Sequence, residues 1–150
     1  LSISRPHHVC IRVSMYEVSD LESDRPVRSS EIRIYGLDEF EGMRRAGRMV
    51  AEALDMIAEH VKPGVTTGEL DDLVREWTLA QGAKPACLGY KGYEKTTCIS
   101  INHVVCHGIP GERVLKEGDI VNIDHTVLLD GWFGDSSRMY SVGAVNARAK

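Results

Sequence analysis

The sequence lacks the marks of several large classes of protein. Its four cysteines show no CxxC spacing, which argues against both a zinc finger and a disulfide framework. No apolar run approaches the ~18 residues of a transmembrane helix, and the N-terminal residues lack the basic start and apolar centre of a secretory signal. A formal net charge of −4 gives no reason to expect binding to nucleic acid or to an anionic membrane. These absences predict a cytoplasmic protein.

What is present suits one globular domain behind an N-terminal tail. A chain of 150 residues, of which 43% are hydrophobic and 27% charged, can bury a single core. Residues 1–30 show no helical or strand period and are rich in charged residues, Ser and Pro from Glu17 onward, so we predict a mobile tail. Within it we expect Met15 to be the natural start. Residues 31–150 are then the folded domain.

Two amphipathic helices are predicted after Gly36. In the first, acidic residues occupy the opening turn, an apolar stripe recurs at three- and four-residue spacing, and Pro63-Gly64 ends the helix. The second begins with a capping box, Thr66 with Glu69, and ends near Gly82. The first stripe comprises Phe40, Met43, Gly47, Val50, Leu54, Ile57 and Val61, and the second comprises Leu70, Leu73, Val74 and Trp77. Both stripes indicate helices that cover a sheet.

The remainder of the domain is rich in strands. A short strand around Ile32 and Ile34 precedes the helices; a loop at 83–95, a strand at 97–101 and a short strand through Val104, Val105 and His107 follow them. Helices followed by antiparallel strands indicate an α+β fold with both helices on one face of the sheet.

A β-hairpin is predicted at the C-terminal end, and it carries two aspartates. Two β-rich runs, 118–129 and 132–142, are joined by Asp130-Gly131, which favours a type I′ turn. The predicted pairs are Leu129 with Trp132, Asp124 with Ser137, and Thr126 with Asp135. Because side chains alternate between faces, Asp124 and Asp135 lie on one face as diagonal neighbours, roughly 7–8 Å apart. Such a pair needs cations, a shared proton or solvent, so a metal site and a hydrated acidic face both remain open.

Several stretches, in order along the chain, resemble the type I methionine aminopeptidases over about residues 31–150. They are Lys-Pro-Gly-Val-Thr-Thr-Gly-Glu-Leu (62–70), Ala-Cys-Leu-Gly-Tyr (86–90), Cys-Ile-Ser-Ile-Asn-His-Val-Val-Cys-His-Gly-Ile-Pro (98–110), Gly-Asp-Ile-Val-Asn-Ile-Asp (118–124) and Asp-Gly-Trp-Phe-Gly-Asp-Ser-Ser (130–137). The resemblance implies the N-terminal half of a pita-bread fold, with two helices packed on an antiparallel sheet.

The resemblance also implies a site that holds two divalent metal ions, of which Co, Mn, Fe and Zn are all compatible with the ligands. Asp124 and Asp135 match two of the family's metal ligands. His107 matches a catalytic histidine that contacts substrate. The pocket for the methionine side chain would draw on Cys87, Tyr90, Tyr93 and Cys98. Without the family, these four would be buried packing residues of the loop and sheet.

Three features depart from the family pattern. The remaining ligands, one His and two Glu, belong to a second half that is absent, so we expect an N-terminal fragment that is inactive and poorly stable alone. His125 stands where an aliphatic residue is usual and, by strand parity, points away from Asp124. Phe133 stands where a His is common, and it removes a polar group near the site.

The activity implied by the resemblance is removal of the N-terminal methionine from nascent polypeptides. The full-length enzyme would be a monomer, with the ribosome as a further partner. The alternative is a catalytically inactive pita-bread protein that binds nascent chains or ribosomes. An Xaa-Pro peptidase is a third interpretation, and the cysteine and tyrosine positions and the Val-Val-Cys-His-Gly run argue against it.

Overall fold

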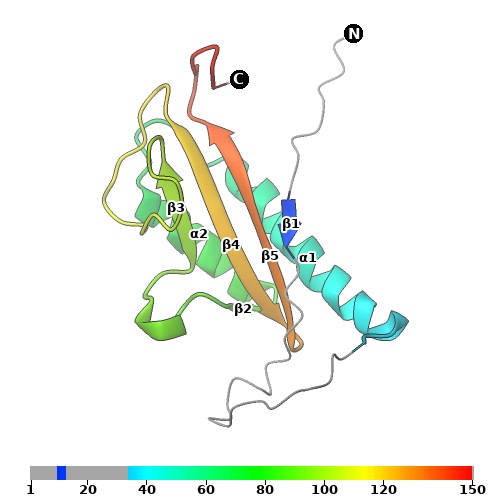
Figure 1. Cartoon of the computed structure of the whole chain (residues 1–150). Helices are drawn as coiled ribbons and strands as arrows, with labels where there is room; N and C mark the ends of the chain where they lie inside the picture. Colours follow the sequence, from blue (N-terminus) through cyan, green and yellow to red (C-terminus); the bar gives the residue numbers. More distant parts are fainter. Residues whose placement is uncertain (1–9, 13–33, 150) are drawn as a thin grey trace.

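The computed structural model describes residues 10–12 and 34–149. Two helices and five strands make up its regular structure, together with one short 3-10 helix (Figure 1). In chain order the elements are β1 (Cys10–Arg12), α1 (Leu37–Ala58), α2 (Thr67–Ala80), β2 (Lys84–Pro85), η2 (Tyr90–Gly92), β3 (Thr97–Ile101), β4 (Ile120–Leu129) and β5 (Trp132–Ser141). Both long helices lie on the same side of the sheet, which confirms the predicted α+β arrangement.

Helix α1 begins where a side chain accepts a hydrogen bond from a backbone amide that has no partner within the helix. The Gly36 amide donates to the Glu39 carboxylate at 2.8 Å, and Asp38 and Glu39 place negative charge in the first turn. The helix ends at Ala58, before the predicted Pro63-Gly64 boundary. The proline ring at position 63 would clash with the carbonyl of the residue four positions earlier. The helix must therefore stop before Pro63 can join it.

Two glycines let α1 pack closely on strand β5. A Cβ atom at Gly134 would overlap the backbone carbonyl of Ala46, and one at Gly42 would overlap the Trp132 ring. The Trp132 ring in turn packs edge-on against Tyr35, with ring centroids 5.5 Å apart. Glycine at positions 42 and 134 thus sets how near the helix lies to the sheet.

Helix α2 has the capping box that the sequence predicted. The Thr66 amide donates to the Glu69 carboxylate at 2.7 Å, and the Glu69 amide donates back to Thr66 Oγ1 at 3.1 Å. At the other end Gln81 caps the helix and Gly82 follows with φ +79°, as expected of a residue just past a helix C-terminus. Both ends of α2 are therefore set by local sequence.

The sheet is antiparallel, with the strand order β1-β5-β4-β2 and with β3 also paired to β4. The predicted hairpin register is confirmed in full: Leu129 pairs with Trp132, Asp124 with Ser137, and Thr126 with Asp135. Asp130 and Gly131 have φ values of +50° and +86°, the positive values that a type I′ turn requires.

The two faces of β4 differ in burial. Val121, Ile123, His125 and Val127 are fully buried under the helices, whereas the residues between them are partly exposed. The core lies between the helices and this face and includes Val50, Leu54, Ile57, Leu70 and Val74. Among the described residues, no helix covers the opposite face, which we call the open face.

Three sequence predictions are changed by the structure. Residues 102–113, all of them described, form no strand, so the short strand through Val104 and His107 is wrong. Phe40, the first residue of the predicted stripe, is 40% exposed. Ile34 is outside any strand, and Ile32 lies outside the described residues. Of the predicted tail, the structure describes only β1, which pairs with β5, and the rest stays a prediction.

Candidate metallopeptidase site

The two hairpin aspartates lie on the open face, as predicted. Asp124 pairs with Ser137 in β5 and with Cys98 in β3, and Asp135 pairs with Thr126. Both carboxylates are partly exposed. The Thr126 hydroxyl donates to Asp135 Oδ1 at 3.0 Å, which orients that carboxylate from the neighbouring strand. A ligand on this face would therefore meet two carboxylates held by adjacent strands.

Cys87 and Cys98 lie near the edge of β4 opposite β5, where β2 and β3 pair with it. Cys98 is the register partner of Asp124, and the residue before Cys87 is tied to β4 by a 2.9 Å bond from its amide to the Thr126 carbonyl. Burial raises the pKa of the Cys87 thiol, and the nearby negative charges of Asp124 and Asp135 raise it further. Burial also raises the pKa of the Cys98 thiol, with a further contribution from Asp124. Both thiols are therefore neutral at pH 7, and they present a soft, weakly polar wall.

Tyr93 joins this group, whereas Tyr90 is turned more toward solvent. The Tyr93 hydroxyl donates to the Thr97 carbonyl at 2.8 Å and lies 3.5 Å from Cys98 Sγ. Burial raises the pKa of Tyr93, and its hydrogen bond with Cys98 adds to the shift. Tyr90 is 60% exposed, and its ring carries the Lys91 ammonium 5.4 Å from the ring centroid. Of the two predicted tyrosines, Tyr93 thus contacts Cys98, whereas Tyr90 is mostly exposed to solvent.

His107 is exposed in the loop that follows β3, with φ +54°. The next residue fixes this part of the loop: Gly108 accepts from the Ile99 amide at 2.8 Å and donates to Ser100 Oγ at 3.1 Å. A Cβ atom at Gly108 would overlap the Ile99 carbonyl, so only glycine permits this approach. The backbone next to His107 is thereby held beside β3, and the His107 side chain is exposed.

His125 lies on the other face, as strand parity predicted. Its side chain is fully buried, and Nε2 is 3.0 Å from the Thr78 hydroxyl. Because Thr78 donates its proton to the Val74 carbonyl, its oxygen accepts from His125. Burial lowers the pKa of His125 to about 4. His125 is therefore a neutral core residue that ties β4 to α2.

Asp71 is the residue that sequence reasoning missed. It is 1% exposed on α2, and its carboxylate accepts hydrogen bonds from Thr96 and Thr97 at the start of β3. A signal was available, since Asp71 follows Leu70 and stands three positions before Val74, on the buried stripe of the helix. A charged residue on an apolar stripe implies a buried polar partner.

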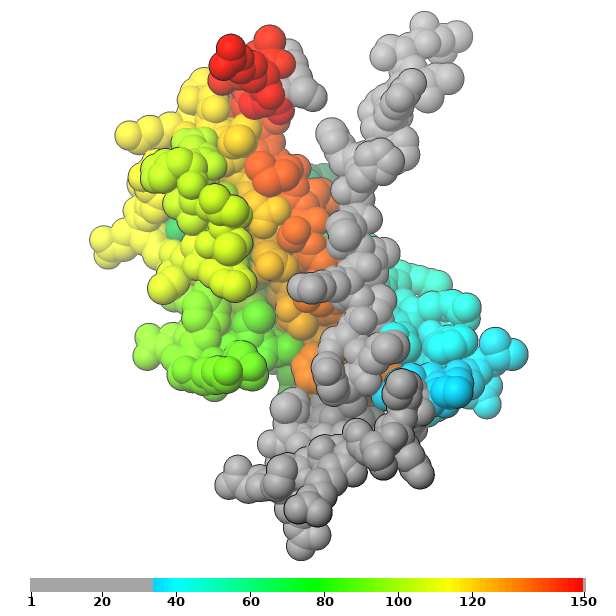
Figure 2. Space-filling view, viewed as in Figure 1, coloured from blue at the N-terminus to red at the C-terminus, as the bar shows by residue number. Residues whose placement is uncertain are grey.

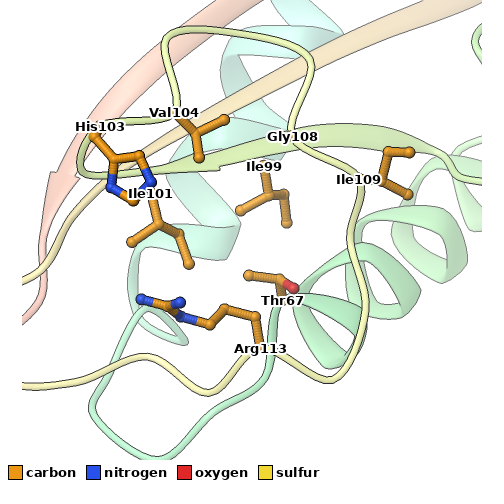
Figure 3. A pocket seen from close by; sticks show the side chains of 8 residues that line it. All are labelled: Thr67, Ile99, Ile101, His103, Val104, Gly108, Ile109 and Arg113. Carbon is orange, nitrogen blue, oxygen red and sulfur yellow. The ribbon is translucent and has the colours of Figure 1, made fainter.

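A separate pocket of about 200 Å³ opens at the edge of β3 (Figure 3). Its lining is mainly aliphatic, and Arg113 and His103 are the charged or titratable side chains in it; the full lining is Thr67, Ile99, Ile101, His103, Val104, Gly108, Ile109 and Arg113. None of the predicted site residues lines this pocket. Asp124 and Asp135 lie on β4 and β5, Cys98 lies on β3, and Cys87 lies in the loop between β2 and β3. Figure 2 shows β4 and β5, in orange, beside the green and yellow loops that precede and follow β3. The candidate site is therefore separate from this pocket.

The aspartates fit divalent metal ions chemically but supply only part of a ligand set. Carboxylate oxygens on one face suit hard and intermediate divalent ions. Within residues 10–12 and 34–149, no group of three or more His, Cys, Asp or Glu side chains is placed to hold an ion. Further ligands would have to come from outside the described residues.

Comparison with known proteins identifies metallopeptidases as relatives of this chain. Residues 41–150 match the sequence profile of Metallopeptidase family M24. The chain is 56% identical over 119 residues to a methionine aminopeptidase of Rickettsia prowazekii, and the aligned region covers 79% of this chain and 46% of that protein. It is 57% identical over 108 residues to the methionine aminopeptidase of Escherichia coli strain K12, covering 71% of this chain and 41% of that protein. The chain thus spans less than half the length of these curated relatives.

Solved structures agree with the sequence match. The crystal structure of the Rickettsia prowazekii methionine aminopeptidase superposes with a TM-score of 0.77, covering 79% of this chain and 48% of that one. The Thermotoga maritima methionine aminopeptidase, 40% identical, gives 0.75 with the same coverage. A prolidase from Pyrococcus furiosus, 23% identical, gives 0.63 over 77% of this chain and 33% of that one, and so shares the fold alone. The predicted N-terminal half of a pita-bread fold is confirmed, and the chain belongs to metallopeptidase family M24.

Proposed function

We propose that this chain is the N-terminal part of a methionine aminopeptidase, a metal-dependent hydrolase that removes the first methionine from nascent proteins. The observation that carries the proposal is the placement of Asp124 and Asp135 on one face of the hairpin, beside Cys87 and Cys98. Carboxylates for metal and thiols for a thioether then lie side by side. High identity to methionine aminopeptidases supports the same reading.

Asp124 and Asp135 would each hold part of a site for two divalent ions, with Co, Mn, Fe and Zn as the candidates. Bound there, such ions would polarise the scissile carbonyl and activate water for hydrolysis. The Thr126 hydroxyl donates a hydrogen bond to Asp135 Oδ1 at 3.0 Å, and this bond would keep the carboxylate oriented toward an ion. From the family resemblance, one His and two Glu would complete the ligand set.

The other predicted residues would bind and orient the substrate. Cys87, Cys98 and Tyr93 would form the wall against the methionine side chain. Because both thiols are neutral, they would present a weakly polar surface that suits a thioether. Tyr90 would contribute at the edge of this pocket. His107 would donate a hydrogen bond to the peptide group that is cleaved, and so stabilise the charge that develops there.

The substrate of this enzyme would be the N-terminal methionine of a nascent chain, with the ribosome as a further partner. We place the protein in the cytoplasm and expect a monomer when it is full length. No described helix is long and apolar enough to cross a membrane. Residues 1–150 alone lack part of the ligand set, so we propose that they are inactive without the remainder of the enzyme.

The test is removal of one carboxylate in the full-length protein. Asp124→Ala should abolish release of methionine from a Met-Ala-Ser peptide and should lower the number of Mn²⁺ ions bound in calorimetry. Asp130→Asn is the matched control, because Asp130 is an exposed turn residue with φ +50° whose carboxylate only pairs with Arg45 at 3.2 Å. Unchanged methionine release by Asp124→Ala would refute the assignment. Full-length protein that binds methionyl peptides without cleaving them would favour the inactive binding protein.

A further inference from the structure

Asp71 makes a concentrated set of hydrogen bonds in the interior of the protein. Its Oδ1 accepts from the Thr97 amide at 2.7 Å, from the Thr97 hydroxyl at 2.6 Å and from the Thr96 amide at 3.1 Å. The side chain is 1% exposed, and Thr96 and Thr97 are fully buried. A buried carboxylate is costly unless such donors compensate it. Asp71 therefore holds the amides of Thr96 and Thr97 and the Thr97 hydroxyl in place.

The atoms that Asp71 holds lead directly to the proposed methionine pocket. Thr97 is the first residue of β3 and directly precedes Cys98. Hydrogen bonds that hold the Thr97 amide and hydroxyl therefore also hold the start of the strand that carries the Cys98 thiol. The Thr97 carbonyl accepts from the Tyr93 hydroxyl at 2.8 Å, and the same hydroxyl lies 3.5 Å from Cys98 Sγ. Two walls of the pocket, Tyr93 and Cys98, are thus positioned by one residue, Thr97.

The arrangement links a helix on the covered face to a surface on the open face. Asp71 belongs to α2, which packs under the sheet, whereas Cys98 is the register partner of Asp124 on the open face. The neighbouring acid, Asp72, shows the contrast: its side chain is 54% exposed and pairs with Arg75 on the same helix at 2.8 Å. Of two adjacent aspartates, only Asp71 reaches β3 from α2.

We propose that Asp71 is a positioning residue for substrate selection: through Thr97 it sets the spacing of Tyr93 and Cys98, and thereby the fit of the first side chain of the substrate. The proposed effect of Asp71 on substrate selection rests on the proposed aminopeptidase function. The positioning of Tyr93 and Cys98 by Asp71 does not depend on that function, so positioning and selectivity can be tested separately.

The first experiment measures the accessibility of each thiol in the folded full-length protein. Iodoacetamide labelling is followed by peptide mass spectrometry in wild type, Asp71→Asn and the control Asp72→Asn. In Asp71→Asn, an NH₂ group replaces Oδ2, which accepts from the Thr96 amide at 3.3 Å. Two N–H groups would then face each other, which should move the side chain and weaken its bonds to Thr96 and Thr97. We expect labelling of Cys98 to rise by about tenfold relative to Cys87, since weakening a hydrogen bond to a charged group allows local opening of about that size.

Cys87 and Cys106 make the measurement specific to the pocket. Cys106 is exposed and reports intrinsic thiol reactivity, whereas Cys87 is half-buried like Cys98 and reports global opening. If Cys87 and Cys98 labelling rise together, Asp71 has a purely structural role and the proposal is overturned. If Asp71→Asn does not fold, Thr97→Val serves, because it removes only the 2.6 Å hydroxyl bond. A selective rise at Cys98 in Thr97→Val supports the proposal, and an unchanged ratio overturns it.

The second experiment measures selectivity in the same proteins. Asp71→Asn should raise KM for a methionyl tripeptide more than it changes kcat, and should reduce the preference for N-terminal Met over Leu by about tenfold, the range that side-chain fit in an apolar pocket supplies. Unchanged selectivity in an active enzyme would overturn the inference. A selective rise in Cys98 labelling without any methionine release would instead overturn the proposed function, and would leave the positioning of Tyr93 and Cys98 by Asp71 in force.

Discussion

Replacing three glycines by alanine should destabilise the protein in a fixed order. The Cβ atom added by Gly134→Ala would overlap the Ala46 carbonyl, a backbone atom of α1 that cannot rotate away. Gly42→Ala would overlap the Trp132 ring, a side chain that can turn at some cost to its packing on Tyr35. Gly111→Ala meets no atom within 4 Å. We therefore expect Gly134→Ala to cost the most and Gly111→Ala to be close to neutral.

The magnitudes follow from how far the backbone must move. Overpacking a well-packed interior costs about 1–3 kcal/mol, and Gly134→Ala should fall near the upper end because α1 and β5 must separate. Gly42→Ala should cost about 1 kcal/mol, and Gly111→Ala should change stability by less than about 1 kcal/mol, since alanine restricts the unfolded chain. For a protein of this size or larger, about 3 kcal/mol lowers the melting temperature by roughly 6–12 °C.

Calorimetric melting of the three full-length variants is the assay, and Mn²⁺ titration adds a second measurement. Gly134 immediately precedes Asp135, so moving β5 away from α1 should also weaken metal binding in Gly134→Ala. Gly111→Ala should bind metal as the wild type does. A Gly134→Ala protein that melts within a degree or so of wild type would refute the packing argument. So would a Gly111→Ala protein that melts lower than Gly134→Ala.

Three further predictions concern single side chains. Burial lowers the folded-state pKa of His125 to about 4, below its unfolded value, so the unfolded state binds more protons between these two pKa values. The contribution of His125 to stability should therefore be full above about pH 6.5 and fall as the pH drops toward 4. Denaturant titrations should show that His125→Val loses part of this pH dependence. Thr126→Val removes the donor to Asp135 Oδ1 and should weaken Mn²⁺ binding by about 10-fold or more in calorimetry, whereas unchanged affinity would remove Thr126 from the site. Thr66→Ala breaks the capping box of α2 and should cost about 1 kcal/mol in a urea titration, with metal affinity retained.

The parts of the fold predicted correctly from sequence are those fixed by local interactions. Thr66 and Glu69 are three residues apart and satisfy each other's amides whatever the rest of the chain does. Asp130-Gly131 tolerates the positive φ values of its turn, and the turn sets the register of every pair in the hairpin. That register by itself places Asp124 and Asp135 on one face of the hairpin.

The strand predicted through Val104 and His107 shows where local pattern fails. Val104 and Val105 have high strand propensity, yet Val105 is 91% exposed in a loop. The free edge of β3 is bonded instead to Gly108, whose lack of a side chain allows it to reach the Ile99 carbonyl. Strand formation depends on an available partner edge, and propensity cannot supply one. The outcome was decided by a glycine three residues after Val105.

The sequence by itself determined the helix ends, the hairpin turn and its register, and through them the shared face of the two aspartates, because each depends on residues close together in the chain. Only the tertiary structure decided what surrounds that face. It brought Cys87 and Cys98 to the edge of β4 opposite β5, hydrogen-bonded Tyr93 to Cys98, and joined Asp71 of α2 to Thr97 of β3. These contacts join residues on different elements, and the packing of α2 under the sheet selects the Asp71 contact from the many that its side chain could make. Periodicity fixes which way a side chain points, and packing fixes what it meets.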